Sequence, residues 1–238
     1  MGDYSFKPGW AVSLGFVALV ALFVSLGLWQ LQRAEAKRAL MADRAARLRE
    51  APVRLSRAAT DPEALRYRRV EATGEYDAAH QFLLDNQLHQ GQPGYWVLTP
   101  LRLPDGAAVL VNRGWVPQGA DRRQLPAVEL HTTQVQVSGV VERFPRVGFR
   151  LAGAEIPAPG WPARVQVAEP GPLAERLGYP ILPYQVLLDP AAGEGYVRDW
   201  TPPALGPEKN LGYAVQWFLF AAVATILYLW HGFKPRSR

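Results

Sequence analysis

Two long uncharged segments constrain this chain more than any other feature of its sequence. The first extends from Pro8 to Gln32 and the second from Asn210 to Gly232, and both are dominated by apolar residues. As an α-helix, the first segment would be about 37 Å long at 1.5 Å per residue, which exceeds the ~30 Å hydrocarbon core of a bilayer. We therefore predict two transmembrane helices, over residues 10–32 and 210–232.

The first segment could instead be a cleaved signal peptide, with Lys7 as its basic start. However, the segment is longer than the apolar stretch of about 7 to 15 residues that a signal peptide carries. No small-residue cleavage site follows Leu31 before the charge at Arg33. We therefore expect the first helix to remain as a membrane anchor.

Two membrane crossings would place residues 1–9 and 233–238 on one side and residues 33–209 on the other. Positive charge favours the cytoplasmic side, but here it occurs on both sides. The C-terminal tail carries Lys234, Arg236 and Arg238, whereas the segment after the first helix carries Arg33, Lys37, Arg38, Arg44, Arg47 and Arg49. The chain has no cysteine, which weakly favours an extracytoplasmic domain because exposed thiols there are prone to oxidation.

The segment between the two apolar runs divides into a helix and a β-rich domain. Residues 33–51 form a basic juxtamembrane helix, because Arg33 to Arg49 consists of strong helix formers without Gly or Pro. Residues 52–209 contain short strand-like runs separated by turn residues, which favours an α+β domain resembling a barrel or a sandwich. The predicted strands are 69–76, 81–87, 95–103, 107–116, 135–141, 164–167 and 182–188, with a turn at 104–106 and a helix at 172–177.

The composition argues against several classes of function. The lack of cysteine excludes disulfides, Cys-ligated metals and a Cys nucleophile. Residues 70–209 carry eleven basic and fifteen acidic residues, so this domain has no basic footprint for nucleic acid. The two serines of the loop, Ser56 and Ser138, lie outside any G-x-S-x-G motif. The sequence therefore predicts no enzyme.

A metal site in the loop is also not predicted. The best candidates for zinc ligands are Asp77, His80, Asp85 and His89, and their spacing fits no known ligand pattern. We expect His80, His89 and His131 to be solvent-facing residues at hairpin ends, and we predict no metal-binding residue.

Polar and aromatic residues form a stripe at the start of the second apolar segment. Helical spacing places Asn210, Tyr213, Trp217 and Ala221 within one face, and the first segment contributes Trp29, Gln30 and Arg33 at the same depth. A flat amphiphile or a partner helix could bind there; alternatively, these residues are interfacial anchors. Small residues four apart predict close helix approach at Ala11 and Gly15, Ala21 and Ser25, and Ala221 and Thr225.

One further motif covers residues 112–117. An apolar strand reaches Asn112 and Arg113 and then continues through Gly114 to Trp115 and Pro117. We interpret it as a strand that leaves the core at a bend, or as a partner contact. Gly114 would then serve a positive φ angle or a close approach, and Arg113 would pair with an acidic group.

Four motifs in order make the chain resemble a known family. They are LGLWQLQR at 26–33 followed by Lys37, the segment from Arg69 through Gly74 to Tyr76, VLVNRGWVP at 109–117, and LGYAVQWF at 211–218. In this order, between two apolar segments, they resemble the surfeit locus/Shy family of cytochrome c oxidase assembly factors over nearly the full length.

The resemblance implies a non-enzymatic role in maturing the large haem-bearing subunit of an aa-type haem–copper oxidase, by holding or delivering haem a. The implied partners are that subunit and haem a synthase. It also implies a multi-pass protein of the bacterial inner membrane with a periplasmic domain. The alternative that we keep open is a membrane-anchored ligand-binding or sensing module with a periplasmic β-domain.

The sequence departs from the family at one position. In members proposed to bind haem a, a histidine at the start of the second helix is the candidate iron ligand, and the matching residue here is Asn210. Asparagine is a poor substitute for imidazole as an axial haem ligand. Trp29, Arg33, Tyr213 and Trp217 are therefore the candidate cofactor-binding residues, as a haem-edge or partner surface, with Arg33 able to pair a propionate.

Overall fold

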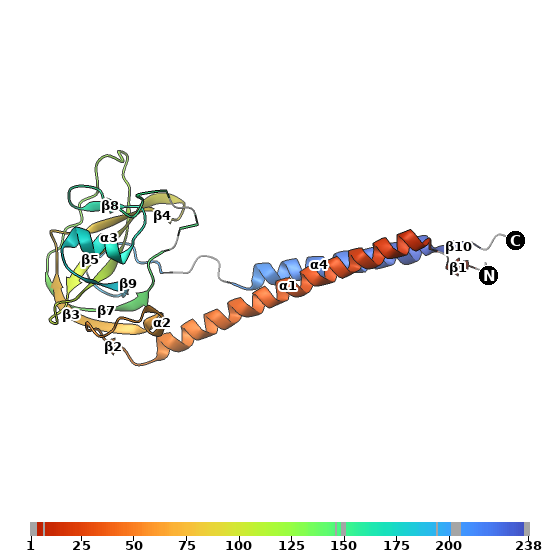
Figure 1. The fold of residues 1–238 in the computed structure, drawn as a ribbon, viewed down its shortest axis with the longest axis horizontal. Helices are drawn as coiled ribbons and strands as arrows, with labels where there is room; N and C mark the ends of the chain where they lie inside the picture. Colours follow the sequence, from red (N-terminus) through yellow and green to blue (C-terminus); the bar gives the residue numbers. More distant parts are fainter. Residues whose placement is uncertain are drawn as a thin grey trace. The chain divides into compact units, whose positions relative to one another are not determined.

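The computed structural model describes residues 4–6, 8–145, 147–148, 151–193, 195–200 and 206–235. These residues form two compact units (Figure 1). A helical unit contains Met1–Asp43 and Pro202–Arg238, and a sheet-rich unit contains Arg44–Thr201. Of the basic residues discussed above, Lys7, Arg236 and Arg238 lie outside the described residues.

The helical unit is built from α1 (Trp10–Arg49, whose last residues belong to the sheet-rich unit) and α4 (Glu208–Gly232). Both helices are long and apolar enough to cross a membrane, judged by length and composition. The short strands β1 (Tyr4–Phe6) and β10 (Phe233–Pro235) pair antiparallel next to the start of α1 and the end of α4. The first apolar segment and the basic segment after it form one uninterrupted helix, as expected from their strong helix formers.

The two helices run antiparallel and pack along one seam. The least exposed positions of each helix recur at alternating spacings of three and four residues, which is the spacing of a coiled-coil seam. Four seam residues are both small and buried, so the two backbones approach closely. The seam consists of Ser13, Phe16, Val20, Phe23, Gly27, Gln30, Ala34 and Lys37 on α1, and of Asn210, Ala214, Trp217, Ala221, Ala224 and Tyr228 on α4.

The small residues that form the seam are mostly not the predicted ones. Ala11, Gly15, Ala21 and Ser25 are exposed, so the prediction was wrong for the first two pairs, while in the third pair Ala221 is buried in the seam and Thr225 is half-buried. The reason is that small residues four apart occur on several faces of α1. The face that pairs is decided by the partner helix.

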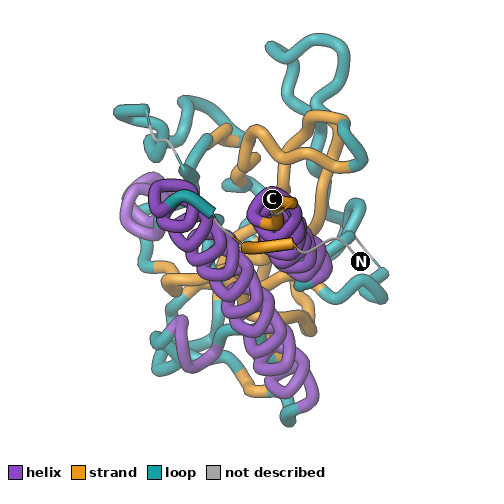
Figure 2. The backbone as a smooth tube through the Cα atoms, turned by 90° about the vertical axis from the view of Figure 1, so that its right-hand side faces the viewer, coloured by secondary structure: helices purple, strands orange, loops and turns teal. Residues whose placement is uncertain are grey.

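The sheet-rich unit consists mainly of strands and loops (Figure 2). All seven predicted strands are present, six of them with shifted ends, and one eight-stranded sheet has the order β2-β3-β7-β9-β6-β5-β4-β8. The strands are β2 (Val53–Arg54), β3 (Arg69–Tyr76), β4 (Phe82–His89), β5 (Gln92–Arg102), β6 (Ala108–Pro117), β7 (Gln134–Glu142), β8 (Ala163–Val165) and β9 (Ile181–Leu188). Two short helices, α2 (Pro62–Leu65) and α3 (Pro170–Leu177), complete it.

An additional pairing, between β3 and β5, closes part of the sheet into a ring. Strand β3 contacts β7 on one side and β5 on the other, through Glu75 opposite Arg102 and Tyr76 opposite Leu101. Strands β3, β7, β9, β6 and β5 therefore form a ring in which each strand pairs with two others of the ring. The two-residue strand β2 and the four-residue helix α2 were not predicted, because such short elements carry no measurable periodicity.

Strand β6 lies at the centre of the unit and is buried on both faces. Val109 and Val111 belong to one apolar cluster, whereas Leu110, which points to the other face, belongs to a second. The first cluster also contains Tyr184 of β9, and the second contains Phe82 of β4. The continuous apolar run that predicted this strand reflects this two-sided burial.

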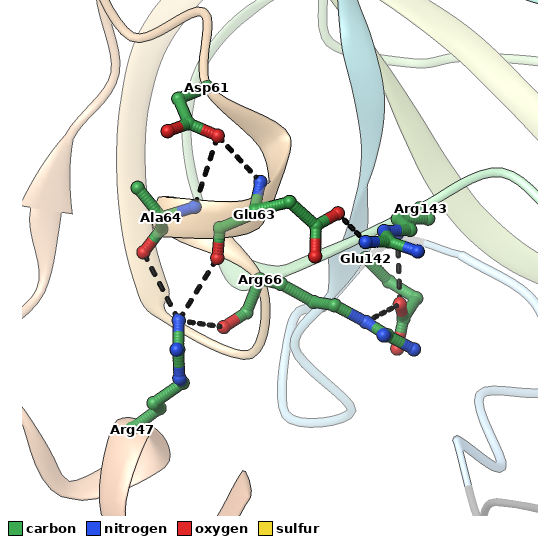
Figure 3. A network of polar contacts seen from close by, with 7 residues as sticks. All are labelled: Arg47, Asp61, Glu63, Ala64, Arg66, Glu142 and Arg143. Atoms are coloured by element: carbon green, nitrogen blue, oxygen red, sulfur yellow. Dashed lines mark hydrogen bonds and ion pairs between the residues drawn. The ribbon is translucent and has the colours of Figure 1, made fainter. Parts of the chain in front are cut away.

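The last turn of α1 is held against α2 within the sheet-rich unit (Figure 3). The Arg47 guanidinium donates hydrogen bonds to the backbone carbonyls of Glu63, Ala64 and Arg66 at 3.0 to 3.5 Å. Asp61 caps the other end of α2 by accepting from the amides of Glu63 and Ala64. Since four residues cannot sustain a helix alone, these contacts stabilise α2.

Candidate functional site

A polar contact joins the two helices where the predicted stripe begins. The side-chain amide of Asn210 donates from Nδ2 to Oε1 of Gln30 at 2.7 Å. The Asn210 Oδ1 atom is buried and accepts no hydrogen bond from the described residues. The sequence placed Gln30 at the same depth as Asn210, and the structure brings the two together.

Aromatic packing continues along the seam away from this contact. The Trp217 ring stacks near Phe23 with 5.8 Å between centroids, and it meets Phe220 edge-on at 5.7 Å. Phe218 lies against Gly27, where an added Cβ would be only 2.7 Å from the ring. Sequence reasoning did not select Gly27, although a glycine inside a long apolar helix was the available signal.

The other predicted site residues point away from the seam. Trp29 is 51% exposed, Tyr213 is 54% exposed, and Arg33 is also exposed. Of the four predicted site residues, Trp217 therefore packs in the seam, as Asn210 also does, whereas Trp29, Tyr213 and Arg33 remain accessible. The accessible residues could contact a partner.

The geometry at Asn210 does not fit an axial haem ligand. One end of the amide is engaged by Gln30, and the free end offers a neutral carbonyl oxygen in place of an imidazole nitrogen. No group of three or more His, Cys, Asp or Glu side chains arranged to hold a metal ion was found within the described parts of the chain.

The motif at 112–117 agrees with its prediction at Gly114 but not in the course of the strand. Strand β6 does not end at a bend but continues through the motif to Pro117. The predicted close approach at Gly114 is confirmed: its φ angle is +121°, and an added Cβ would lie 2.7 Å from the Val197 carbonyl oxygen. Residues 195–197 run beside the strand, with backbone hydrogen bonds between Trp115 and Val197.

Arg113 is buried without an acidic partner, contrary to the prediction. It is 3% exposed, and no carboxylate of the described residues lies within 4 Å of its guanidinium. The guanidinium instead donates to Gln81 Oε1 at 3.3 Å and to the Glu129 carbonyl oxygen at 3.2 Å. The guanidinium carbon of Arg113, Cζ, also lies 5.1 Å from the centre of the Tyr196 ring. The Arg113 side chain is buried because β6 stays in the interior through this motif, where a bend out of the core was expected.

A second polar cluster surrounds Asp77. Its carboxylate accepts from Tyr179 and Arg102 and lies 2.8 Å from Nδ1 of His80. Burial raises the pKa of Asp77, but these hydrogen bonds outweigh burial, so the net pKa lies below the usual value of 3.8. The prediction that His80 faces solvent holds only in part, because its side chain is 41% exposed while its ring packs edge-on against Trp161.

We expect Asp77→Asn to lower the free energy of unfolding by about 1 to 3 kcal/mol near neutral pH, since the ionised acceptor is lost. A carboxyl with a depressed folded-state pKa stabilises the fold above its unfolded-state pKa and loses this effect as the pH falls through the folded-state value. The difference between variant and wild type should therefore shrink below about pH 4 in chemical unfolding curves. Glu75→Gln, at an exposed carboxylate two residues away, is the control and should have little effect.

A comparison with protein families covers most of the chain. A family model described as "SURF1 family" matches residues 17–222, which include both long helices in part and the complete sheet-rich unit. The chain belongs to the SURF1 family. The match includes Gly27, the motif at 112–117, and Asn210, so the features described above all lie within the SURF1 region.

Three SURF1 relatives illustrate the range of the similarity. A SURF1-like protein of Dictyostelium discoideum is 33% identical over 43% of this chain and 41% of its own length. An uncharacterized SURF1-like protein of Mycobacterium tuberculosis is 30% identical over 92% of this chain and 82% of its own length. The "Cytochrome oxidase assembly protein SHY1" of Saccharomyces cerevisiae is 30% identical over 46% of this chain and 29% of its own length. The match thus spans about two fifths of the Dictyostelium protein and less of the yeast protein.

Proposed function

We propose that this protein is a membrane-anchored, non-enzymatic assembly factor for an aa-type haem–copper cytochrome oxidase. The observation that carries the proposal is the SURF1 family match over residues 17–222, together with the printed name of the yeast relative, a cytochrome oxidase assembly protein. The resemblance of the four sequence motifs supports the same role. The partner that we propose is the large haem-bearing subunit of the oxidase, with haem a synthase as a second partner.

In this proposal α1 and α4 cross the membrane as an antiparallel pair. Trp10 and Trp29 are 19 residues apart, or about 28 Å along a helix, and Tyr213 and Trp230 are about 26 Å apart. All four side chains are at least half exposed. Such spacing supports two aromatic belts at the surfaces of a ~30 Å hydrocarbon core.

The remaining arrangement follows from these two crossings. We propose that residues 10–32 and 210–232 lie in the inner membrane of a bacterial cell, with residues 1–9 and 233–238 in the cytoplasm. The basic segment 33–51 and the domain 52–209 would then be periplasmic, with the ring of strands closing as a small barrel. The family resemblance supports this orientation.

The contact surface that we propose lies where the helices emerge toward the sheet-rich unit. Trp29 and Tyr213 offer exposed aromatic rings, and Arg33 offers a cation able to pair a carboxylate or a haem propionate. Trp217 supports this surface from within the seam. If haem a is held here, it is held by these side chains without an axial ligand from Asn210.

Deletion of the gene in the organism that encodes it should lower the activity and haem a content of its aa-type oxidase, while quinol oxidation by other enzymes persists. Trp29→Ala combined with Tyr213→Ala should cause most of the same loss, because the contact surface is removed while both apolar helices remain. Oxidase activity, the haem a absorption band and membrane levels of the variant are measured together.

The matched control combines Trp10→Ala with Trp230→Ala, which removes the exposed aromatic residues at the opposite end of the helix pair. This control should leave oxidase assembly near normal. Equal losses in both double variants would show that all four residues act only as membrane anchors. Normal oxidase after deletion of the gene would contradict the assembly function itself.

A further inference from the structure

A cavity of about 500 Å³ opens next to the buried Arg113. Its wall combines two chain segments: Ala127, Glu129 and His131 on one side, and Gly193, Gly195 and Tyr196 on the other. The lining is mostly polar in character, in contrast to the apolar clusters that β6 separates elsewhere.

Arg113 brings an unbalanced positive charge to this cavity. A buried cation is costly unless an opposite charge or a full set of hydrogen bonds compensates it. Two of its five guanidinium N–H groups donate, one to Gln81 Oε1 and one to the Glu129 carbonyl oxygen. The remaining three have no acceptor among the described residues.

The surroundings hold Arg113 in place without neutralising it. Gln81 is itself fully engaged, since its Oε1 also accepts from Thr99 at 2.8 Å and its Nε2 donates to the carbonyls of Ala78 and Val128. The backbone carbonyl of Arg113 accepts from the Tyr196 amide at 3.0 Å, which fixes the cavity wall to the strand. The guanidinium is therefore positioned rigidly, and its charge is available to a ligand.

The chain packs closely at Gly195, which forms part of the cavity wall. Gly195 has a φ angle of +149°, and an added Cβ would overlap the Arg198 guanidinium and lie 2.8 Å from the Arg113 carbonyl oxygen. The surrounding atoms therefore require glycine at this position, and the space open to a small group of a ligand is the cavity of about 500 Å³ itself.

We propose that this cavity binds a ligand through a carboxylate group, with Arg113 as the charged contact. A guanidinium presents paired N–H donors that match the two oxygens of a carboxylate, and His131 can add a further contact at the wall. The exposed Glu129 side chain beside the cavity disfavours a doubly charged anion such as phosphate. This site is separate from the helix surface assigned to oxidase assembly and does not depend on that function.

The test uses the full-length protein in detergent, labelled with ¹⁵N-arginine, and follows the Nε–H signal of Arg113 by NMR. Acetate should shift this signal in a saturable way, whereas acetamide, its neutral analogue, and sodium chloride at equal ionic strength should not. Inorganic phosphate should bind at least tenfold more weakly than acetate. No saturable shift with acetate, or an equal response to acetamide, would overturn the proposal, and so would tighter binding of phosphate.

Variants separate the site from a general effect on folding. Arg113→Gln should abolish binding but risks destabilising the domain. Ala127→Leu instead fills the cavity from an exposed position and should weaken acetate binding at least tenfold in a folded protein. Ala58→Leu, at an exposed alanine outside the cavity, should bind as the wild type does. Unchanged binding in Ala127→Leu would place the carboxylate elsewhere and overturn the proposal.

Two further arms identify the source of the carboxylate. A capped dipeptide containing one aspartate is compared with acetate: at least tenfold tighter binding indicates an acidic segment of a partner protein, and equal binding indicates a free organic acid. Glu194 follows Gly193 in the sequence and lies outside the described residues. If acetate binds to Glu194→Gln but not to the wild type, the chain supplies the carboxylate itself, and the proposal of an external ligand is overturned.

Discussion

Gly114→Ala should destabilise the sheet-rich unit by about 2 to 5 kcal/mol. A left-handed backbone costs a residue with a side chain about 1 to 2 kcal/mol, and overpacking in a filled interior costs about 1 to 3 kcal/mol more. Both penalties apply here, because φ is +121° and the new methyl group would lie 2.7 Å from the Val197 carbonyl oxygen and 2.8 Å from the Tyr196 carbonyl carbon. These are backbone atoms, so no side-chain rotation relieves the overlap.

The measurement combines denaturant unfolding of the full-length protein with hydrogen exchange. Exchange should increase most in β6 and in residues 195–197, since the contact between them is what the methyl group disrupts. Gly91→Ala is the matched control: Gly91 also has a positive φ, +80°, but an added Cβ meets nothing within 4 Å. The control should cost about 1 to 2 kcal/mol. Equal costs for the two variants would show that the approach of 195–197 to β6 contributes nothing to stability.

Gly27→Leu should separate α1 from α4 at the seam. A Cβ at this position would lie 2.7 Å from two atoms of the Phe218 ring, and the rest of the leucine side chain has no free space between the helices. Alanine could be accommodated by a shift of the ring, whereas leucine forces the backbones apart, at a cost of about 1 to 3 kcal/mol. In the proposed membrane setting, apolar lipid provides no hydrophobic force to restore the pairing, so close packing is the main attraction that would be lost.

Helix pairing can be measured by cross-linking, because the natural chain has no cysteine to interfere. Gln30→Cys and Asn210→Cys, at side chains that contact each other in the native pair, are introduced together and joined with a short bifunctional maleimide. In this background Gly27→Leu should reduce the yield severalfold. Gly15→Leu should not, since Gly15 lies on the same helix with nothing within 4 Å of its Cβ position. A similar loss in both variants would indicate that bulk anywhere on α1 is harmful, and that the seam at Gly27 is not specific.

The sequence was sufficient for the longer elements of this fold. The two apolar helices follow from uninterrupted local composition, and the strands from runs of apolar residues between turn residues, both of which can be read within a window of about ten residues. The assignment to the surfeit locus/Shy family also came from short local motifs, and the SURF1 family match over residues 17–222 confirmed it.

The candidate surface was predictable only in part. Helical spacing placed Gln30 and Asn210 at one depth, and they do meet, yet it also grouped Tyr213 with Trp217, which the structure separates into an exposed and a packed residue. An ideal helix has 3.6 residues per turn, so Tyr213 and Trp217, four residues apart, differ by about 40° around the helix and can lie on different margins of a broad face. Which margin turns inward depends on the partner helix.

What the sequence by itself determined is therefore the longer helices and strands, the absence of cysteine chemistry and the family. The tertiary structure alone decided which groups meet across long separations: Gly114 with Val197, Gly27 with Phe218, and Tyr179 with Asp77, which are 102 residues apart. It also left Arg113 buried beside an open cavity with no acidic partner among the described residues. The physical reason is that periodicity and propensity are properties of neighbouring residues, whereas close packing and charge compensation depend on atoms that only the folded chain brings together.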